Sequence, residues 1–437
     1  MRSSLKRQAD PSPSRHDRNE AEDREASATR SHGMRGIFRS LQNPNYRIWA
    51  IGSLISNIGS WMQRTAQDWI VLVELTDHSA TAVGIVMGLQ FGPQILLLPL
   101  TGYAADHLDR RKLLFCTQAA MGLLALVLGL LVVTGYVQLW HVYVFAFLLG
   151  CAAAFDSPAR QTFVAELVDD DLLPNAVGLN STSFNAARMI GPAIAGSLIA
   201  AVGTSWVFLI NAASFVAVLI SLIVLRTLPL RERPTRARGS LLEGFRYVLG
   251  RDDLKAVLLM LFLIGTFGLN FPIFISTMSV SVFHAGAGAY GLLTSMMAAG
   301  SVIGALMVAA RPRPGIRVLL IGALFFGLGC AAAAAMPNYA SFGIALMLVG
   351  IATQTVTTST NSFVQTSTEH GMRGRVIAIL LAIVLGGTPV GAPIIGWIAY
   401  SFGPRWALGV AAASGVLAAL VAFIYLALRQ SADARAR

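Results

Sequence analysis

The chain has 437 residues, of which 55% are hydrophobic and only 13% are charged, and its formal net charge is +11. Soluble chains carry about 25% charged residues, so a soluble fold of this size would lack its polar surface. The composition therefore indicates an integral membrane protein and excludes a disordered, collagen-like or disulfide-stapled chain. The three cysteines all fall within apolar runs and offer neither a disulfide framework nor the spacing of a metal site.

Residues 1–45 differ from the rest because they are rich in Arg, Ser, Asp and Glu and contain no apolar run. This composition predicts a disordered cytoplasmic tail without a signal peptide. The remainder contains twelve continuously apolar stretches, which favour membrane-spanning helices over the alternating strands of a β-barrel. These stretches are Tyr46–Leu75, Thr81–Ala105, Leu113–Thr134, Leu139–Phe155, Ala176–Val202, Thr204–Leu225, Leu254–Phe283, Ala287–Ala310, Ile316–Met336, Tyr339–Thr366, Val376–Phe402 and Trp406–Leu428.

The basic residues are distributed unevenly about the predicted spans. Thirty of the 33 Lys and Arg residues lie in the termini or in loops on one side. Because cytoplasmic loops hold the excess of Lys and Arg, both termini are expected in the cytoplasm. Trp140, Trp206 and Trp406 begin spans on the opposite side, as interfacial anchors do. The net charge therefore reflects orientation in the membrane, and no nucleic-acid partner is expected.

The two halves of the chain align with each other at an offset of 200 residues. The matched pairs are Phe163 with Phe363, Gly191 with Gly391, Gly196 with Gly396, Gly203 with Gly403, and Trp206 with Trp406. This repeat predicts an all-α integral membrane protein with 12 transmembrane helices, in two parallel six-helix bundles around a cavity, residues 46–225 and 254–428. Residues 226–253 are predicted to form a cytoplasmic linker with a short interfacial helix, and residues 429–437 a cytoplasmic tail.

A loop with a characteristic pattern follows the second span. It carries Gly102, Asp106, Arg110 and Arg111, which suit a tight turn with a helix-capping carboxylate and cations for acidic partners. The alternative is an ordinary positive-inside loop. The pattern resembles the loop between helices 2 and 3 of the major facilitator superfamily, although His107 and Asp109 depart from it.

This resemblance implies a cytoplasmic gate that latches one transport state. In such a gate Arg110 would pair with Asp156, just beyond span 4, and Asp106 would cap helix 11 near Arg375 and Val376. The loop after span 8 lacks the Asp, so only the first half carries a good copy.

Span 5 carries a second pattern of small residues and a proline, which allow close helix packing and a bend. Its residues Gly178, Gly191, Pro192 and Gly196 resemble the antiporter motif in helix 5 of drug-exporting members of the superfamily, although two of the usual glycines are alanine. Residues 43–47, 154–160 and 175–180 are similar to the enterobactin-exporter branch. The helix 4 arginine of many drug–proton antiporters is replaced by Ala146, so another acid or base would have to couple protons.

Polar residues within spans usually face a cavity or a partner, because burying them in lipid is costly. Asn57, Trp61, Arg64 and Asp68 share one face of span 1. Arg64 and Asp68 can pair, which allows two interpretations. In the first, the pair is purely structural. In the second, Asp68 exchanges a proton while Arg64 contacts an anionic or phenolic substrate.

Other intramembrane polar residues are candidates for a substrate and proton pathway, with interhelical hydrogen bonding as the alternative. These are Gln90 and Gln94 in span 2, Asn185 and Arg188 in span 5, Asn270 in span 7, and Gln354, Thr358 and Asn361 in span 10.

These features together predict a secondary active exporter of a small amphipathic organic molecule, siderophore-like or drug-like, driven by a proton gradient. A lysophospholipid or lipid flippase of the same fold and a non-transporting membrane receptor are the alternatives. No metalloprotease, serine-hydrolase or phosphate-loop signature occurs, so neither an enzyme, nor a cofactor, nor a metal is expected. The expected partners are a small-molecule substrate and the lipid bilayer, and the protein is expected to be monomeric in the cytoplasmic membrane.

Overall fold

The computed structural model describes residues 38–225, 241–309, 315–369 and 371–435, and within them it is entirely helical. Of the tail predicted over residues 1–45, residues 1–37 lie outside the described residues, whereas Arg39–Gln42 and the residues from Pro44 onward are helical and not disordered. The first half comprises η1 (Arg39–Gln42), α2 (Pro44–Trp69), η2 (Ile70–Glu74), α3 (Ala80–Leu96), α4 (Leu98–His107), α5 (Arg110–Val133), α6 (Leu139–Leu167), α7 (Leu173–Val202) and α8 (Thr204–Val224). The second half comprises α9 (Leu241–Leu249), α10 (Asp252–Leu263), η3 (Ile264–Gly268), α11 (Phe271–Thr277), η4 (Met278–Val282), α12 (Ala287–Ala309), α13 (Ile316–Ala335), α14 (Tyr339–Ser367), α15 (Arg373–Phe402) and α16 (Pro404–Arg435).

Several helix starts follow directly from the sequence. The Asn43 side chain accepts hydrogen bonds from the backbone N–H groups of Asn45 and Tyr46, and Pro44 occupies the first turn of α2. Asp109 caps α5 by accepting from the backbone N–H of Lys112 at 3.0 Å. The acidic residue that departs from the superfamily loop pattern is therefore a helix cap here.

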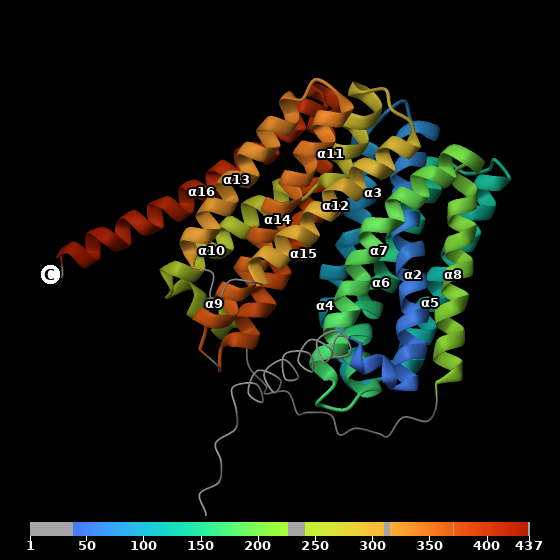
Figure 1. Ribbon diagram of the computed structural model, residues 1–437, viewed down its shortest axis with the longest axis horizontal. Helices are drawn as coiled ribbons and strands as arrows, with labels where there is room; N and C mark the ends of the chain where they lie inside the picture. Colours follow the sequence, from blue (N-terminus) through green and yellow to red (C-terminus); the bar gives the residue numbers. More distant parts are fainter. Residues whose placement is uncertain (1–37, 226–240, 310–314, 370, 436–437) are drawn as a thin grey trace, which may run out of the picture.

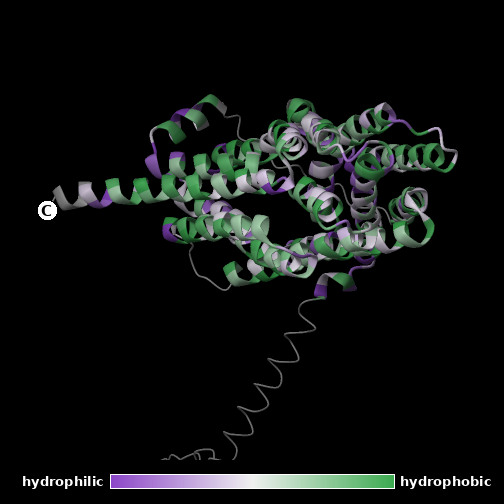
Figure 2. Ribbon diagram, turned by 90° about the horizontal axis from the view of Figure 1, so that it is seen from above, coloured by the Kyte–Doolittle hydropathy of each residue, from purple (hydrophilic) through white to green (hydrophobic). Residues whose placement is uncertain are grey.

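The described residues contain ten helical segments that are long and apolar enough to cross a membrane. Two further apolar segments, α2 with η2 and α3 with α4, complete a set that corresponds to the twelve predicted stretches. The helices are predominantly hydrophobic along their length (Figure 2). Many large apolar side chains are exposed, among them Ile223, Leu306 and Phe325, as expected where lipid is the solvent. The predicted all-α membrane fold is confirmed.

The helices form two bundles that meet at one end and diverge toward the other (Figure 1). Glycines bring the backbones of the two halves into direct contact at the closed end. A Cβ atom added to Gly396 in α15 would lie 2.5 Å from the Ala80 carbonyl oxygen of α3. A Cβ atom added to Gly196 in α7 would lie 2.5 Å from the Ala287 carbonyl oxygen of α12. The halves are therefore sealed at this end by glycine-mediated helix packing.

The two halves share their irregularities as well as their helices. A π-helical segment ends the first spanning helix at Ile70–Glu74, and another ends the seventh at Met278–Val282. Gly203 and Gly403 connect consecutive helices with φ angles of 91° and 102°, a region that favours glycine. The seventh helix has an additional π-helical segment at Ile264–Gly268 that interrupts it near its middle.

Three segments add detail to the sequence prediction. The second span is divided at Leu97 into α3 and α4, because Pro93 and Pro99 interrupt the regular backbone bonding. The last helix continues to Arg435, so most of residues 429–437, predicted as a cytoplasmic tail, extend this helix. In the inter-half segment, α9 lies against α15, where Glu243 forms an ion pair of 3.0 Å with Arg375.

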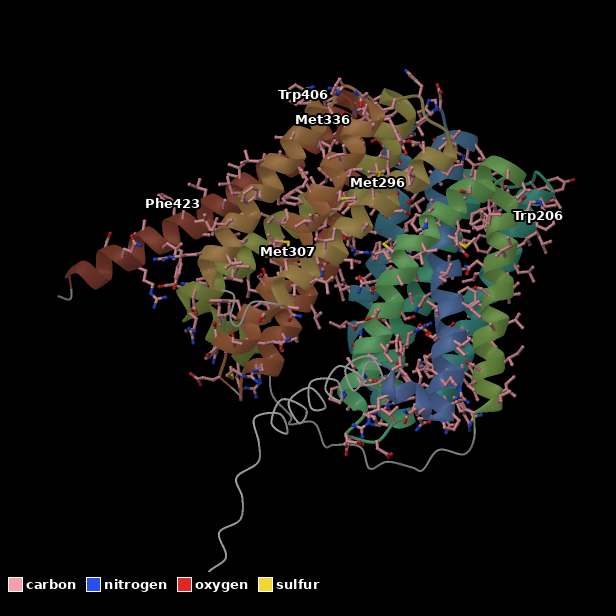
Figure 3. All side chains as sticks on the ribbon, in the orientation of Figure 1. Trp206, Met296, Met307, Met336, Trp406 and Phe423 are labelled. Atoms are coloured by element: carbon pink, nitrogen blue, oxygen red, sulfur yellow. The ribbon has the colours of Figure 1, made fainter. Side chains whose placement is uncertain are left out.

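Trp206 and Trp406 both lie toward the upper end of the molecule in Figure 3, which is the closed end. Their side chains are exposed, as is that of Trp140. Three exposed indole rings at the starts of helices suit the boundary between lipid and water.

Candidate functional site

A cavity of about 220 Å³ lies between the two halves, below the closed end. From the first half its walls include Trp61, Arg64 and Asp68 of α2 and Arg188 of α7, and from the second half they include Tyr290 of α12. Gln90 of α3 also lines it. We call this the narrow cavity. It brings together predicted site residues from three helices of the first half and adds a tyrosine from the second.

Asp68 is bound across the interface between the halves. The Tyr290 hydroxyl donates a hydrogen bond of 3.0 Å to Asp68 Oδ2, and the Tyr290 ring stacks on Trp69. Both Asp68 and Tyr290 are buried, with exposed fractions of 8% and 1%. A hydrogen bond to a carboxylate is among the stronger kinds, so this contact ties α2 to α12.

The expected ion pair between Arg64 and Asp68 is not formed. The Arg64 guanidinium instead lies over two aromatic rings, with Cζ 4.9 Å from the centroid of Trp61 and 5.5 Å from that of Phe91. Helical spacing places Arg64 and Asp68 on one face, but the aromatic rings hold the guanidinium away from the carboxylate.

A second cavity, of about 740 Å³, lies within the first half, and we call it the wide cavity. Its walls include Asn57, Gln94 and Asn185 of the predicted pathway. Trp61, Arg64 and Phe91 line both cavities, so the two spaces adjoin at these residues. The predicted polar face of span 1 is thus divided between them.

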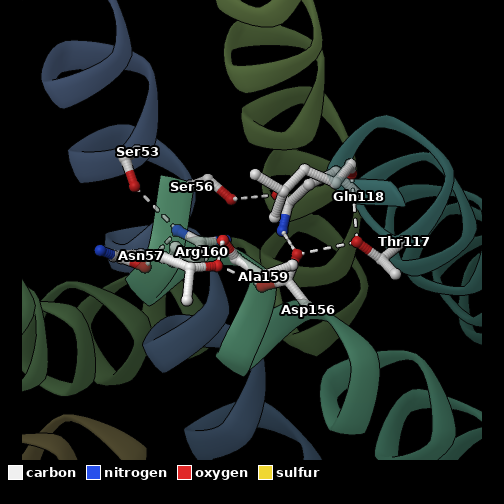
Figure 4. Close-up of polar contacts among 10 residues, drawn as sticks. Ser53, Ser56, Asn57, Thr117, Gln118, Asp156, Ala159 and Arg160 are labelled. Carbon is white, nitrogen blue, oxygen red and sulfur yellow. Dashed lines mark hydrogen bonds and ion pairs between the residues drawn. The ribbon is translucent and has the colours of Figure 1, made fainter. Parts of the chain in front are cut away.

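A buried polar network forms part of the wall of the wide cavity (Figure 4). Asp156 Oδ1 accepts hydrogen bonds from Thr117 Oγ1 at 2.9 Å and from Gln118 Nε2 at 2.6 Å. Asp156 Oδ2 is paired with Arg160 Nε at 3.1 Å. Arg160 also donates to Ser53 at 2.8 Å and to Asn57 at 3.2 Å. The network joins α2, α5 and α6 and satisfies both buried charges.

The prediction that Arg110 pairs with Asp156 is therefore wrong. Arg110 pairs with Glu166, near the end of α6, while Asp156 takes a partner one turn along its own helix. Arg111 donates from Nε to the Leu222 carbonyl oxygen at 2.8 Å, at the end of α8. These arginines hold the first half together at the end opposite the closed one.

The other residues of the expected gate are Gly102 and Asp106 of α4 and their expected neighbour Arg375. Asp106 belongs to α4, but its side chain lies outside the described residues, so its expected position near Arg375 and Val376 stays a prediction. Gly102 has open space around its Cα. Arg375 is paired with Glu243 of α9.

The glycines of the helix 5 pattern have different surroundings. Gly191 packs against α2, where an added Cβ would lie 2.7 Å from Trp61 Cβ. Gly196 and Pro192 pack against α12 of the other half, with the Pro192 carbonyl oxygen facing Gly291. Gly178 has no atom within 4 Å of such a Cβ. Two of the three glycines therefore set helix contacts, one inside the first half and one between halves.

The predicted residues of spans 7 and 10 lie outside the walls of these two cavities. Gln354 Nε2 donates to Thr358 Oγ1 at 3.0 Å, and Gln365 Nε2 donates to Asn361 Oδ1 at 3.1 Å. Asn270 is fully buried and donates to the Thr266 carbonyl oxygen at 2.7 Å, across the interruption of the seventh helix. These side chains bond within their own helices.

Sequence reasoning did not single out Tyr290, Glu166 or Arg160 as site residues. At an offset of 207 residues, Ala289-Tyr290-Gly291 matches Ala82-Val83-Gly84 of the first half, and the tyrosine in place of valine was an available signal. Arg160 stands four residues after Asp156, the spacing of an intrahelical ion pair. Glu166 had no comparable signal, because its partner lies on another helix.

Comparisons with known proteins agree with this architecture. Residues 36–437 match the family model described as transmembrane secretion effector. The chain is 25% identical over 365 residues to the staphyloferrin A transporter of Staphylococcus aureus, covering 80% of this chain and 88% of that protein. It is 26% identical over 380 residues to the enterobactin exporter EntS of Escherichia coli, covering 82% and 87% of the two chains.

The fold also matches solved transporter structures. The crystal structure of a bacterial homolog of the human lysosomal transporter Spinster, inward-facing and unoccupied, superposes with a TM-score of 0.71. The match covers 88% of this chain and 97% of that one, with 14% sequence identity. The two-bundle architecture, the cavities and the family match thus agree on a transporter and not an enzyme. The chain belongs to the transmembrane secretion effector family and is a multi-pass membrane transporter of the major facilitator superfamily.

Proposed function

We propose that this transporter exports a small amphipathic organic molecule across the cytoplasmic membrane in exchange for protons, by alternating access of its two halves. The two relatives are named for staphyloferrin A transport and enterobactin export, which favours a siderophore-like cargo over other drug-like molecules. The charge asymmetry of the sequence supports an orientation with both termini and the open end in the cytoplasm. In this orientation the wide cavity takes up cargo from inside.

The hydrogen bond between Tyr290 and Asp68 is the observation that carries the proposal. It joins a titratable acid, the wall of a cavity and the contact between the halves in one place. Protonation of Asp68 removes the negative charge from the acceptor and so weakens this bond. Proton binding would thereby favour separation of α2 from α12, which is the change needed to open the closed end.

The end of α4 and the start of α5 have a second role in the proposal. Gly102, Asp106, Arg110 and Arg111 would form a gate that closes the cytoplasmic end when the two halves approach there. We expect Asp106→Ala to reduce turnover at normal abundance in the membrane, whereas a wild-type rate would remove Asp106 from the gate.

The experiment is uptake into everted membrane vesicles, with a catecholate siderophore, a citrate-type siderophore, a macrolide and ethidium as test cargoes. Asp68→Asn keeps the shape of the side chain and removes its charge, so uptake driven by a pH gradient should be lost while exchange without a gradient persists. Asp77→Asn is the matched control, because Asp77 follows the same helix with a fully exposed side chain. Undiminished gradient-driven uptake by Asp68→Asn would contradict proton coupling through this residue.

A further inference from the structure

We propose that the cargo is an organic anion, whose acidic group binds Arg64 and Arg188 in the narrow cavity while its apolar body occupies the wide cavity. This inference rests on the proposed function, since it names the chemical class of the molecule carried. It selects anionic amphiphiles, such as aryl or alkyl carboxylates, over the cationic molecules that a drug exporter could otherwise carry.

The first observation is that two arginines in the cavity walls form no ion pair, although the carboxylate of Asp68 lies near enough to attract the Arg64 guanidinium. Arg64 and Arg188 both line the narrow cavity, and neither forms an ion pair or a hydrogen bond with another described residue. Arg160, in the wall of the wide cavity, is by contrast paired with Asp156 and bonded to two further side chains. Arg160 is therefore bonded within the protein, whereas the N–H groups of Arg64 and Arg188 remain available to a ligand.

The second observation is the depth of these charges. Arg64 lies roughly 15 Å along its helix from Glu74, and Arg188 lies roughly 21 Å from Val202, at 1.5 Å per residue. Both guanidinium groups are thus well inside the span. A cation at this depth is costly without a counter-charge, and such residues commonly mark the path of a substrate or ion.

The third observation is the charge balance of the walls. The charged residues that line the two cavities are Arg64, Arg160, Arg188, Asp68 and Asp156. One positive charge is therefore in excess when Asp68 is ionised, and two are in excess when Asp68 is protonated. Asp68 is bonded to Tyr290 rather than to either free arginine. An anionic cargo would neutralise this excess, whereas a cationic cargo would increase it.

The fourth observation is the arrangement of aromatic rings around Arg64. The guanidinium lies over Trp61 and Phe91, and Trp61 contacts Phe184 edge-on with ring centroids 5.8 Å apart. A guanidinium held over aromatic rings spends no N–H hydrogen bond on them, so these groups can bind a carboxylate through two parallel hydrogen bonds. The same rings line the wide cavity, where they offer apolar surface to the rest of the molecule.

Equilibrium binding tests the inference without any gradient. The full chain in nanodiscs of zwitterionic lipid would be titrated with 1-pyrenebutyrate, 1-pyrenebutanol and 1-pyrenebutylammonium, which share one aromatic body, and anisotropy would report binding. We expect the carboxylate to bind at least about tenfold more tightly than the alcohol, and the ammonium most weakly. Arg64→Gln and Arg188→Gln should each weaken carboxylate binding about tenfold and leave alcohol binding unchanged.

Two further sets of variants complete the test. Arg64→Lys and Arg188→Lys keep the positive charge and should retain the preference for the anion. Arg405→Gln is the matched control, because Arg405 lies at the exposed start of α16 and donates to the Ala334 carbonyl oxygen at the end of α13, away from both cavities. Binding of the alcohol to each variant verifies that it is folded.

Equal binding of the three probes, a preference for the ammonium, or an anion preference that survives both Gln substitutions would overturn the inference. The outcome is separable from that of the proposed function. Loss of proton-driven export with a retained anion preference would contradict antiport alone. Proton-driven export of ethidium together with no anion preference would support antiport and contradict an anionic cargo.

Discussion

The hydroxyl of Tyr290 donates to the carboxylate of Asp68 across the boundary between the two halves, at 3.0 Å and out of contact with bulk solvent. The two residues are separated by 222 positions in the chain, and each lies on a helix that also lines the narrow cavity. A change at either residue therefore acts on the closed end and on the cavity together.

Removing the Tyr290 hydroxyl should slow transport. Tyr290→Phe keeps the ring that stacks on Trp69 and deletes the donor to Asp68. Without this bond the closed end no longer depends on the protonation of Asp68. A hydrogen bond to a charged group contributes about 1.5–3 kcal/mol, so we expect gradient-driven export to fall about tenfold or more. Initial rates in proteoliposomes measure the effect. Tyr339→Phe is the control, because its hydroxyl donates to the Ala289 carbonyl oxygen and not to Asp68. Similar losses in both variants would contradict a specific role for Tyr290.

A side chain at Gly196 should open the closed end. The Cβ atom in Gly196→Ala would lie 2.5 Å from the Ala287 carbonyl oxygen, so α7 and α12 must move apart. In a chain whose three cysteines are replaced, we expect an introduced Thr81→Cys to react several-fold faster with a membrane-impermeant maleimide. Gly178→Ala, in the same helix with open space around it, should leave the labelling rate unchanged. Equal labelling in the two backgrounds would show that the contact at Gly196 does not close this end.

Neutralising Asp156 should destabilise the first half. Asp156→Asn leaves the Arg160 guanidinium buried without its counter-charge and disturbs the bonds from Thr117 and Gln118. Removing one partner of a fully buried ion pair costs about 3–5 kcal/mol, and Arg160 is partly buried, so the Tm of the purified protein should fall by an amount that corresponds to a part of that cost. Asp171→Asn breaks the exposed Arg39–Asp171 pair instead and should leave the Tm close to that of the wild type. Equal Tm values for the two variants would refute the importance of the network.

Breaking the ion pair between Glu243 and Arg375 should loosen α9. Glu243→Gln removes the charge that holds this short helix against α15, so amide hydrogen exchange across residues 241–249 should rise about threefold. Asp252→Asn serves for comparison, because it removes the exposed partner of Lys255 within α10. Unchanged protection in Glu243→Gln would mean that apolar contacts such as those of the buried Val248 hold α9 in place.

The fold could be predicted from the sequence because lipid imposes strong rules on composition. Each span must satisfy its backbone hydrogen bonds internally, so continuous apolar stretches of sufficient length are helices. The glycine matches between the halves, such as Gly196 with Gly396, also correspond to equivalent contacts, each sealing the closed end against a helix of the other half. The division of the second span at Leu97 was not predicted, although its prolines were visible in the sequence.

The candidate site could be predicted only in part, because spacing along a helix gives the face of a residue and not its partner. Helical periodicity brought Asn57, Trp61, Arg64 and Asp68 to one face, and all four line a cavity. The partner of Asp68 depends on the register of α12 against α2, which no local pattern contains. The assignment of Asp156 to Arg110 was wrong for a related reason, since a residue four positions away on the same helix was overlooked.

The contact that closes one end of the molecule has a consequence for its response to salt. That end is sealed by backbone atoms packed against glycines, and within the described parts of the chain no ion pair joins the two halves. At 0.1 M salt, dissolved ions weaken interactions between exposed charges that are more than about 10 Å apart. The contacts that seal this end contain no exposed charge. Raising the ionic strength should therefore leave the sealed end closed. The opposite end is rich in arginine and depends on charge, so salt should change how readily that end opens and closes.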